Sequence, residues 1–177
     1  MIYEEKTIKS ERIYEGNILN LRKDTVTVIN GQSEREIVEH GGGAVIIAVT
    51  KDNKIVMVRQ YRKAAGRVML ELPAGKRDGD EDFSVTAERE LKEETGYTAG
   101  AMKFVSRMYT SPGYTEETLY IYLATDLTPG ETDFDDNEAL DIEEYPIDEA
   151  VSMVLSGKIE DGKSQAGILM ANEILRR

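Results

Sequence analysis

The sequence contains no cysteine and a single histidine, His40. The lack of cysteine excludes disulfide bonds, thiolate nucleophiles and thiolate zinc sites. One histidine alone builds neither a histidine-based metal centre nor a catalytic triad with serine or cysteine. We therefore expect His40 to be an ordinary residue of a loop or a strand end.

Long apolar runs are also missing. No stretch of 18 apolar residues is present, and the charged start of the chain, MIYEEKTIKSERIYEG, lacks the apolar centre of a signal peptide. These features predict a cytoplasmic protein. The chain has 177 residues, 40% of them hydrophobic, which is enough for one domain with a core and a small addition.

Basic residues are few, with 22 lysines and arginines against 34 acidic residues and a net charge of -12. This balance disfavours nonspecific binding to nucleic acid. The segments VRQYRKAAGR and GKR nevertheless place several basic residues, among them Arg59 and Arg62, just before the most acidic stretch. They are either solvated strand ends and a loop, or they hold an anionic ligand beside a site that binds cations.

The apolar pattern predicts an α/β or α+β sandwich with helices on both faces of a sheet. Residues 1–40 alternate weakly and predict antiparallel strands, with a hairpin near Asn30-Gly31. This region is too thin for a core of its own, so we expect it to pack on the main domain, 41–177, or on a second subunit. The expected strands of the main domain are 44–50, 54–61, 68–73, 102–110, 118–127 and 142–146, and the expected helices are 82–95, 148–156 and 163–175.

The helix at 82–95 lies in a stretch, 74–97, with eight acidic residues. Phe83, Ala87 and Leu91 fall on one face of this helix, which predicts the face that packs on the sheet. Glu93 is four residues after Arg89, so the two can form an ion pair. Neither Glu90 nor Glu94 has a basic residue four positions away, and acidic charge near a helix C-terminus is unfavourable.

A bound divalent cation would relieve the repulsion among these carboxylates. Carboxylate oxygens without histidine or cysteine suit Mg²⁺, with Mn²⁺ as a substitute. The plainer alternative is an acidic face in contact with solvent. The segment DGDED lacks the spacing of an EF-hand calcium loop, so that kind of site is set aside.

Gly75 is followed after five residues by Glu81, and after seven more by RELKEETGY, 89–97. This spacing resembles the signature of the Nudix hydrolases, which cleave a nucleoside diphosphate linked to another group. All seven fixed positions of the signature match, Leu91 fits its bulky apolar position, and Tyr97 is a mild departure at the last such position. The motif covers 23 residues, and the resemblance implies an α/β fold, a Nudix-type α/β/α sandwich with a mixed sheet.

The resemblance also implies roles for these residues. Glu90 and Glu94 would be the principal Mg²⁺ ligands, Glu93 would contribute directly or through water, and the carbonyl of Ala74 would be a further ligand. Glu93 and Glu94 would thus belong to the catalytic group. The remaining motif residues would be structural: Gly75, Glu81, Arg89 and Gly96. Among them, Glu81 would orient Arg89 or a ligand.

Three further features resemble the ADP-ribose pyrophosphatase branch of the family. They are Pro112, fifteen residues beyond Tyr97, the segments VRQYR and ELPAG, and the N-terminal strands, which in that branch exchange between the two subunits of a homodimer. This branch would hydrolyse ADP-ribose to AMP and ribose 5-phosphate. The implied substrate-binding residues are Arg62, which we favour over Arg59, together with Glu71, Pro112 and Gly113.

Other functions stay open. Relatives that hydrolyse GDP-mannose share the Ser-Pro-Gly sequence, so GDP-mannose or another nucleotide sugar is the first alternative substrate. A Nudix-fold sensor that binds ADP-ribose without cleaving it is less expected, because this chain keeps every glutamate of the motif.

The branch implies a general base on a loop far downstream. Here that loop is DFDDNEALD, and we choose Glu138 as the base, with Asp136 second. The alternative is that the loop is only acidic and solvated.

If the acidic helix is completed by metal, Mg²⁺ should raise the melting temperature of the protein. Thermal unfolding with Mg²⁺ and with a chelator measures this directly, and equal melting temperatures would argue against the metal site.

Overall fold

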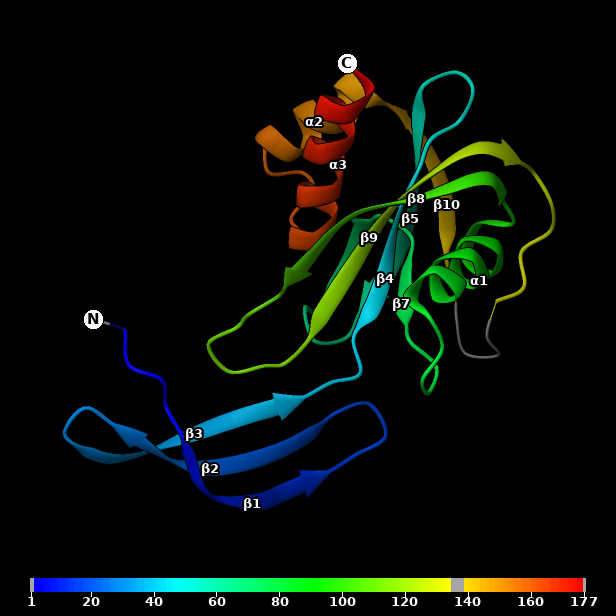
Figure 1. The fold of residues 1–177 in the computed structure, drawn as a ribbon. Coiled ribbons are helices and arrows are strands. Elements are labelled where there is room, and N and C mark those ends of the chain that lie inside the picture. The colour runs from blue at the N-terminus through cyan, green and yellow to red at the C-terminus, as the bar shows by residue number, and fades with distance from the viewer. Residues whose placement is uncertain (1, 135–138, 177) are drawn as a thin grey trace. The chain divides into compact units, whose positions relative to one another are not determined.

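The computed structural model describes residues 2–134 and 139–176. The chain forms two compact units (Figure 1). The smaller unit comprises residues 1–42 and 109–118, and the larger unit comprises residues 43–108 and 119–177. We describe each unit by itself.

The smaller unit is built on an antiparallel sheet of β1 (Thr7–Glu15), β2 (Asn20–Val28) and β3 (Gly31–Glu39). The expected hairpin is confirmed, since Val28 is paired with Gly31, whose φ of 114° is a conformation that glycine tolerates best. Val38 exchanges backbone hydrogen bonds with residues 114–116. The segment after β8 therefore extends this unit.

The larger unit contains the remaining strands and all the helices of the described residues (Figure 1). The strands are β4 (Gly43–Ala48), β5 (Lys54–Arg62), β6 (Arg67–Glu71), β7 (Ala74–Lys76), β8 (Thr98–Tyr109), β9 (Thr118–Thr128) and β10 (Asp141–Pro146). The helices are α1 (Phe83–Thr95), α2 (Ile147–Leu155) and α3 (Gly162–Leu175).

The strand β4 lies inside the larger unit and is buried along its whole length. Its side chains alternate between two cores, as the period of a strand requires. Val45 and Ile47 pack with residues of α2 and α3, whereas Ala44 and Ile46 pack with Ala87 and Leu91 of α1. This two-sided burial explains the continuous apolar run GAVIIA.

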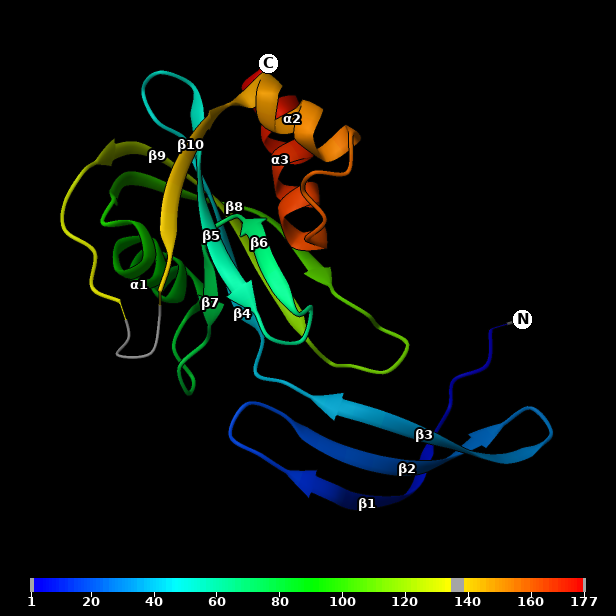
Figure 2. The same ribbon diagram turned by 180° about the vertical axis from the view of Figure 1, so that it is seen from behind.

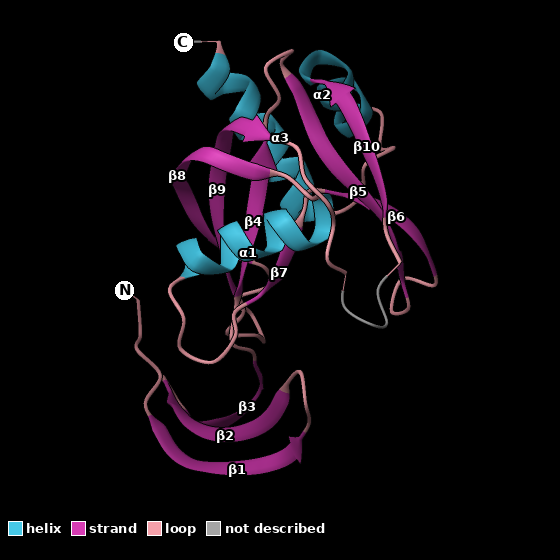
Figure 3. Cartoon of the chain, turned by 90° about the vertical axis from the view of Figure 1, so that its right-hand side faces the viewer, coloured by secondary structure: helices cyan, strands magenta, loops and turns pink. Residues whose placement is uncertain are grey.

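Two sheets make up the framework between the helices. One has the order β7-β4-β9-β8, with β4 and β9 parallel and β4 and β7 antiparallel, and the other has the order β10-β5-β6. The helix α1 covers one face of the first sheet (Figure 3), and α2 and α3 belong to the core on the opposite face, as the reverse view also shows (Figure 2). The expected α/β sandwich with a mixed sheet is confirmed.

The expected strand at 68–73 is continued beyond its proline by a second short strand. The chain leaves β6 at Glu71 and pairs again as β7 from Ala74, in the other sheet. Pro73 lies between them, and proline has no N–H to donate to a sheet. Its carbonyl accepts a hydrogen bond from Ile46 N (2.9 Å), so the crossing segment is held against β4.

Among the described residues, none of the helices has both the length and the apolar composition needed to span a bilayer.

Candidate active site

The ends of α1 are set by two local signals. Asp82 caps the N-terminus, where its side chain accepts a hydrogen bond from Ser84 N (2.8 Å). Gly96 ends the helix with a left-handed φ of 73°, and its N–H donates to Lys92 O (2.8 Å). A Cβ at Gly96 would also lie 2.6 Å from the carbonyl oxygen of Gly130, so glycine is required there for space as well as for conformation.

Arg89 is the positive partner of the acidic cluster. Its guanidinium donates to carboxylate oxygens of Glu81 (2.9 Å), Glu90 (2.8 Å) and Glu93 (2.9 Å), and to the carbonyl of Lys76 (3.0 Å). The expected pairing with Glu93 is present. The contact with Glu90 was not expected, because adjacent residues of a helix do not face each other, and the length of the arginine side chain makes it possible.

The ion pairs shift the pKa values of two of these groups. Burial alone would lower the pKa of Arg89, but its hydrogen bond to Glu81 and its interactions with Glu90 and Glu93 outweigh this and raise the pKa. The pKa of Glu81 is lowered, first by the hydrogen bond from Arg89 and then by the N–H of Asp78. Thr86 also donates to Glu81 (2.9 Å), so this carboxylate is fixed from three directions.

Glu90 and Glu94 lie against the backbone of β7. Glu94 is 4% exposed, and its Oε2 accepts a hydrogen bond from Ala74 N (2.9 Å). The carboxylate of Glu90 occupies the space where a side chain at Gly75 would begin, since a Cβ there would lie 1.8 Å from the carboxyl carbon of Glu90. Gly75 thus lets α1 approach β7 closely enough to bring both carboxylates to the strand.

These residues fit a divalent cation in donor chemistry. Glu90, Glu93 and Glu94 offer carboxylate oxygens from one side of α1, and β7 adds backbone oxygens, the ligand set that Mg²⁺ prefers. Within residues 2–134 and 139–176, no group of three or more acidic or histidine side chains is arranged to hold a metal ion. Arg89 holds Glu90 and Glu93 in the arrangement described here.

A second charged cluster surrounds Glu71, which is 1% exposed. Arg62 binds both of its carboxylate oxygens, at 2.7 Å each, and Lys163 contacts it as well. Burial alone would raise the pKa of Glu71, but the hydrogen bonds and charges of Arg62 and Lys163 outweigh it and lower the pKa. Lys163 also contacts Asp161 (2.9 Å), so the cluster joins β5 and β6 to the start of α3.

This cluster lies within electrostatic reach of the α1 site. The pKa of Arg62 is raised mainly by its hydrogen bond with Glu71, and the charges of Glu94 and Asp161 add to the effect. Sequence reasoning missed Lys163 and Asp161. The Asp161 cap of α3 could have been found from its position before a helix, but the contact between Lys163 and Glu71 joins residues 92 positions apart and depends on the fold.

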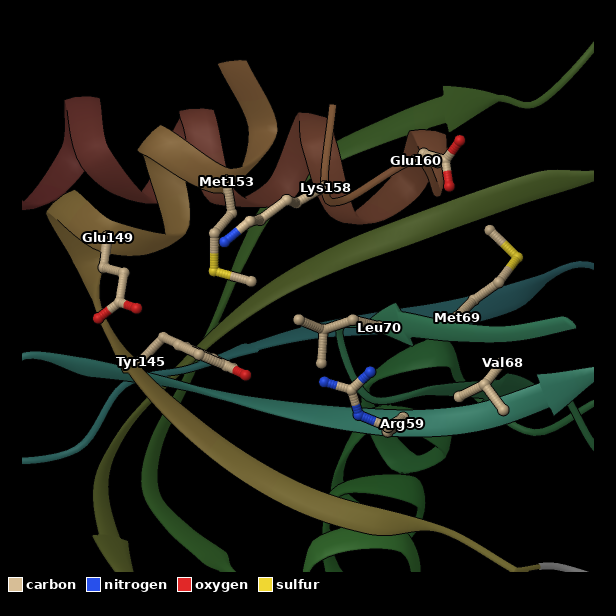
Figure 4. A pocket seen from close by; sticks show the side chains of 9 residues that line it. All are labelled: Arg59, Val68, Met69, Leu70, Tyr145, Glu149, Met153, Lys158 and Glu160. Carbon is tan, nitrogen blue, oxygen red and sulfur yellow. The ribbon is translucent and has the colours of Figure 1, made fainter. Parts of the chain in front are cut away.

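Arg59 and Arg62 point to opposite faces of β5, because they are three residues apart on a regular strand. Arg59 faces a cavity of about 350 Å³ between the β10-β5-β6 sheet and α2 (Figure 4). There it donates to Glu143 (2.8 and 3.1 Å), which also accepts a hydrogen bond from the Tyr145 hydroxyl. The preference for Arg62 over Arg59 as a substrate-binding residue stays a prediction.

Four expected residues do not belong to the described part of the larger unit. Pro112 and Gly113 lie in the smaller unit, so their role stays a prediction. Glu138 and Asp136, the two candidates for the general base, fall outside the described residues. The start of their loop is nevertheless placed, because Asp133 N donates to the carbonyl of Glu93 (3.1 Å).

Comparison with known proteins agrees with the motif. The model of the NUDIX domain matches residues 40–166. The chain belongs to the Nudix family. Tyr97, where the family pattern has a bulky apolar residue, packs partly into the core under α1 and donates its hydroxyl to Glu144 (2.8 Å).

Three similar proteins span nearly the whole chain. The methanol dehydrogenase activator of Bacillus methanolicus is 44% identical over 166 residues, which are 92% of this chain and 90% of that protein. The ADP-ribose pyrophosphatase of Bacillus subtilis (strain 168) is 40% identical over 168 residues, 93% of this chain and 91% of that protein. A solved structure of an ADP compounds hydrolase has a TM-score of 0.87 at 20% identity and covers 99% of this chain and 96% of that one, which shows the shared fold.

The close approach at Gly75 gives a testable expectation. In Gly75→Ala the new methyl group must displace Glu90 from β7, since the gap is 1.8 Å. We expect divalent-metal affinity, measured by titration calorimetry, to fall about 10- to 100-fold, as it does when supports of metal ligands are removed. Gly41→Ala is the control, because a Cβ at Gly41 meets no atom within 4 Å. Unchanged affinity in Gly75→Ala would show that Glu90 does not bind metal from this position.

Proposed function

We propose that this protein hydrolyses the diphosphate of ADP-ribose, or of a close nucleoside diphosphate sugar, with Mg²⁺ as cofactor. The observation that carries the proposal is the position of two motif carboxylates between α1 and β7, with Glu94 bonded to Ala74 and Glu90 seated against Gly75. The 40% identity with an ADP-ribose pyrophosphatase over nearly the whole chain supports the choice of substrate.

Glu90 and Glu94 would hold the metal ion, with Glu93 and the Ala74 carbonyl as further ligands. A bound Mg²⁺ supplies positive charge for the substrate diphosphate and for the attacking water. Its presence matters because the chain carries a net charge of -12 and by itself would repel the substrate. Arg89 would keep the carboxylates in place, and Glu81 would orient Arg89.

Arg62 would bind a phosphate or the terminal ribose. Two of its nitrogens are bound to the buried Glu71, which orients the guanidinium, while its side chain is 40% exposed and open to a ligand. The predicted contributions of Glu71, Arg59, Pro112 and Gly113 to substrate binding stay part of this proposal.

A glutamate on the loop before β10 would take the proton from the attacking water. Glu138 is our choice and Asp136 the second. The hydrogen bond from Asp133 N to the Glu93 carbonyl supports this assignment, because it ties the start of the loop to the metal-binding end of α1. A loop suits a group that must close over a substrate.

The smaller unit would join two subunits into a homodimer. Its sheet buries little apolar surface of its own: every residue of β1 is exposed. Large apolar side chains remain exposed in the unit, and they are of the kind that a partner subunit covers: Ile8, Ile13, Tyr14, Ile18, Leu19 and Ile29.

A panel of substrates with Mg²⁺ tests the proposed reaction. We expect release of AMP from ADP-ribose to exceed release of GMP from GDP-mannose, with products separated by chromatography. Faster release of GMP would replace ADP-ribose by GDP-mannose as the substrate. Tight binding of ADP-ribose with no AMP released would identify a sensor in place of a hydrolase.

The carboxylates can be tested by removing one charge at a time. Glu90→Gln and Glu94→Gln should each lose at least ~10²-fold in turnover, the size of metal and electrostatic effects at such sites. Glu88→Gln is the matched control, because Glu88 lies on the same helix and is exposed. Glu138→Gln should lose turnover with nearly unchanged KM, and a rise in KM alone would count against a base at this position.

A second candidate function follows from the 44% identity with a methanol dehydrogenase activator. The protein would then activate a methanol dehydrogenase while keeping the same carboxylate site. Assaying a purified methanol dehydrogenase with the wild-type protein and with Glu94→Gln separates the cases. Stimulation by the wild type but not by Glu94→Gln would support this function. No stimulation by the wild type would exclude it.

A further inference from the structure

The four residues 71–74 connect the two charged clusters of the larger unit. At one end, the carboxylate of Glu71 contacts Lys163, and Leu72 N donates to Ser164 Oγ (2.7 Å). Both partners belong to the first turn of α3. The segment is therefore attached to α3 through a side chain and through the backbone of consecutive residues.

At its other end the same segment reaches the proposed metal site. Ala74 N donates to Glu94 Oε2 (2.9 Å), and the carbonyl of Pro73 accepts from Ile46 N (2.9 Å). Three residue steps of an extended chain span roughly 10 Å. A movement of Glu71 would therefore be transmitted through this short segment to the Ala74 amide and the carboxylate of Glu94.

The first turn of α3 is itself rigidly organised. One oxygen of Asp161 accepts from Ser164 N (3.0 Å), from the Ser164 hydroxyl (2.5 Å) and from the ammonium of Lys163 (2.9 Å). Ser164 is fully buried, and the side chain of Lys163 is 14% exposed. A single carboxylate thus fixes both residues of α3 that hold the 71–74 segment.

We propose that Lys163 is a positioning residue for the α1 site: it holds Glu71 together with Arg62, and through the 71–74 segment it sets the place of the Glu94 carboxylate. The proposal rests on the proposed metal-dependent function for its consequence in catalysis, but the mechanical link itself does not depend on which substrate is hydrolysed. Charged supports of this kind orient metal ligands without touching the metal.

Two variants at this position separate charge from size. In Lys163→Met, Glu71 keeps Arg62 but loses its second cation, so the 71–74 segment should loosen. We expect the Ala74 amide to exchange hydrogen roughly tenfold faster, as seen by NMR on the metal-free protein, and the Kd for Mg²⁺ to rise about tenfold. Lys163→Arg should restore both values to within about threefold of wild type, because the positive charge is kept.

Lys158→Met is the matched control. Lys158 lies shortly before α3, is exposed, and forms no ion pair within the described part of the chain, whereas Lys163 pairs with Glu71 and Asp161. It should leave the exchange of the Ala74 amide and the binding of Mg²⁺ unchanged. If Lys163→Met does not fold, Ser164→Ala removes the acceptor of Leu72 N and should accelerate exchange at Ala74 in the same way.

An Ala74 amide that exchanges at the wild-type rate in a folded Lys163→Met protein overturns the inference. If Lys163→Met shows the faster exchange and the wild-type protein releases no AMP from ADP-ribose, the link stands and the proposed substrate is removed. The two failures are thus distinguishable. A merely structural role would lower the melting temperature of Lys163→Met without selective change at Ala74 or in Mg²⁺ affinity.

Discussion

Packing of α1 on β4 forces carboxylates into the narrow space between this helix and β7. Leu91 and Ala87 must face the core, and the turn of the helix then directs Glu90 and Glu94 toward the backbone of β7. Acidic groups in such a position need positive partners or hydrogen-bond donors. Arg89, the Ala74 amide and, in our proposal, a metal ion meet that requirement.

The strand β4 makes this arrangement compatible with a stable protein. Its alternate side chains belong to two separate cores, so the core shared with α2 and α3 does not depend on the acidic site. The neighbouring strand β5 is also two-sided, which explains why Arg59 and Arg62, only three residues apart, serve different surroundings. One face of β5 presents Arg62 to Glu71, and the other presents Arg59 to the cavity beneath α2.

Local signals in the sequence predicted much of this structure. The expected helix at 82–95 is α1, the apolar run at 44–50 predicted the strand that becomes β4, and the 23-residue motif indicated the family. Features that join distant residues were not predictable in this way. The contact of Lys163 with Glu71 depends on how α3 meets β6, and β7 is defined only by its pairing with β4.

The smaller unit is discontinuous in the sequence, and this has a consequence for how the protein can be divided. Residues 109–118 interrupt the larger unit, and their backbone bonds to Val38 of β3. A chain cut after residue 42 would leave Tyr114 and Glu116 without these hydrogen bonds. The two units therefore cannot be separated by a single cut. If the N-terminal strands were exchanged with another copy, β3 of that copy would have to supply the hydrogen bonds that residues 109–118 make with Val38.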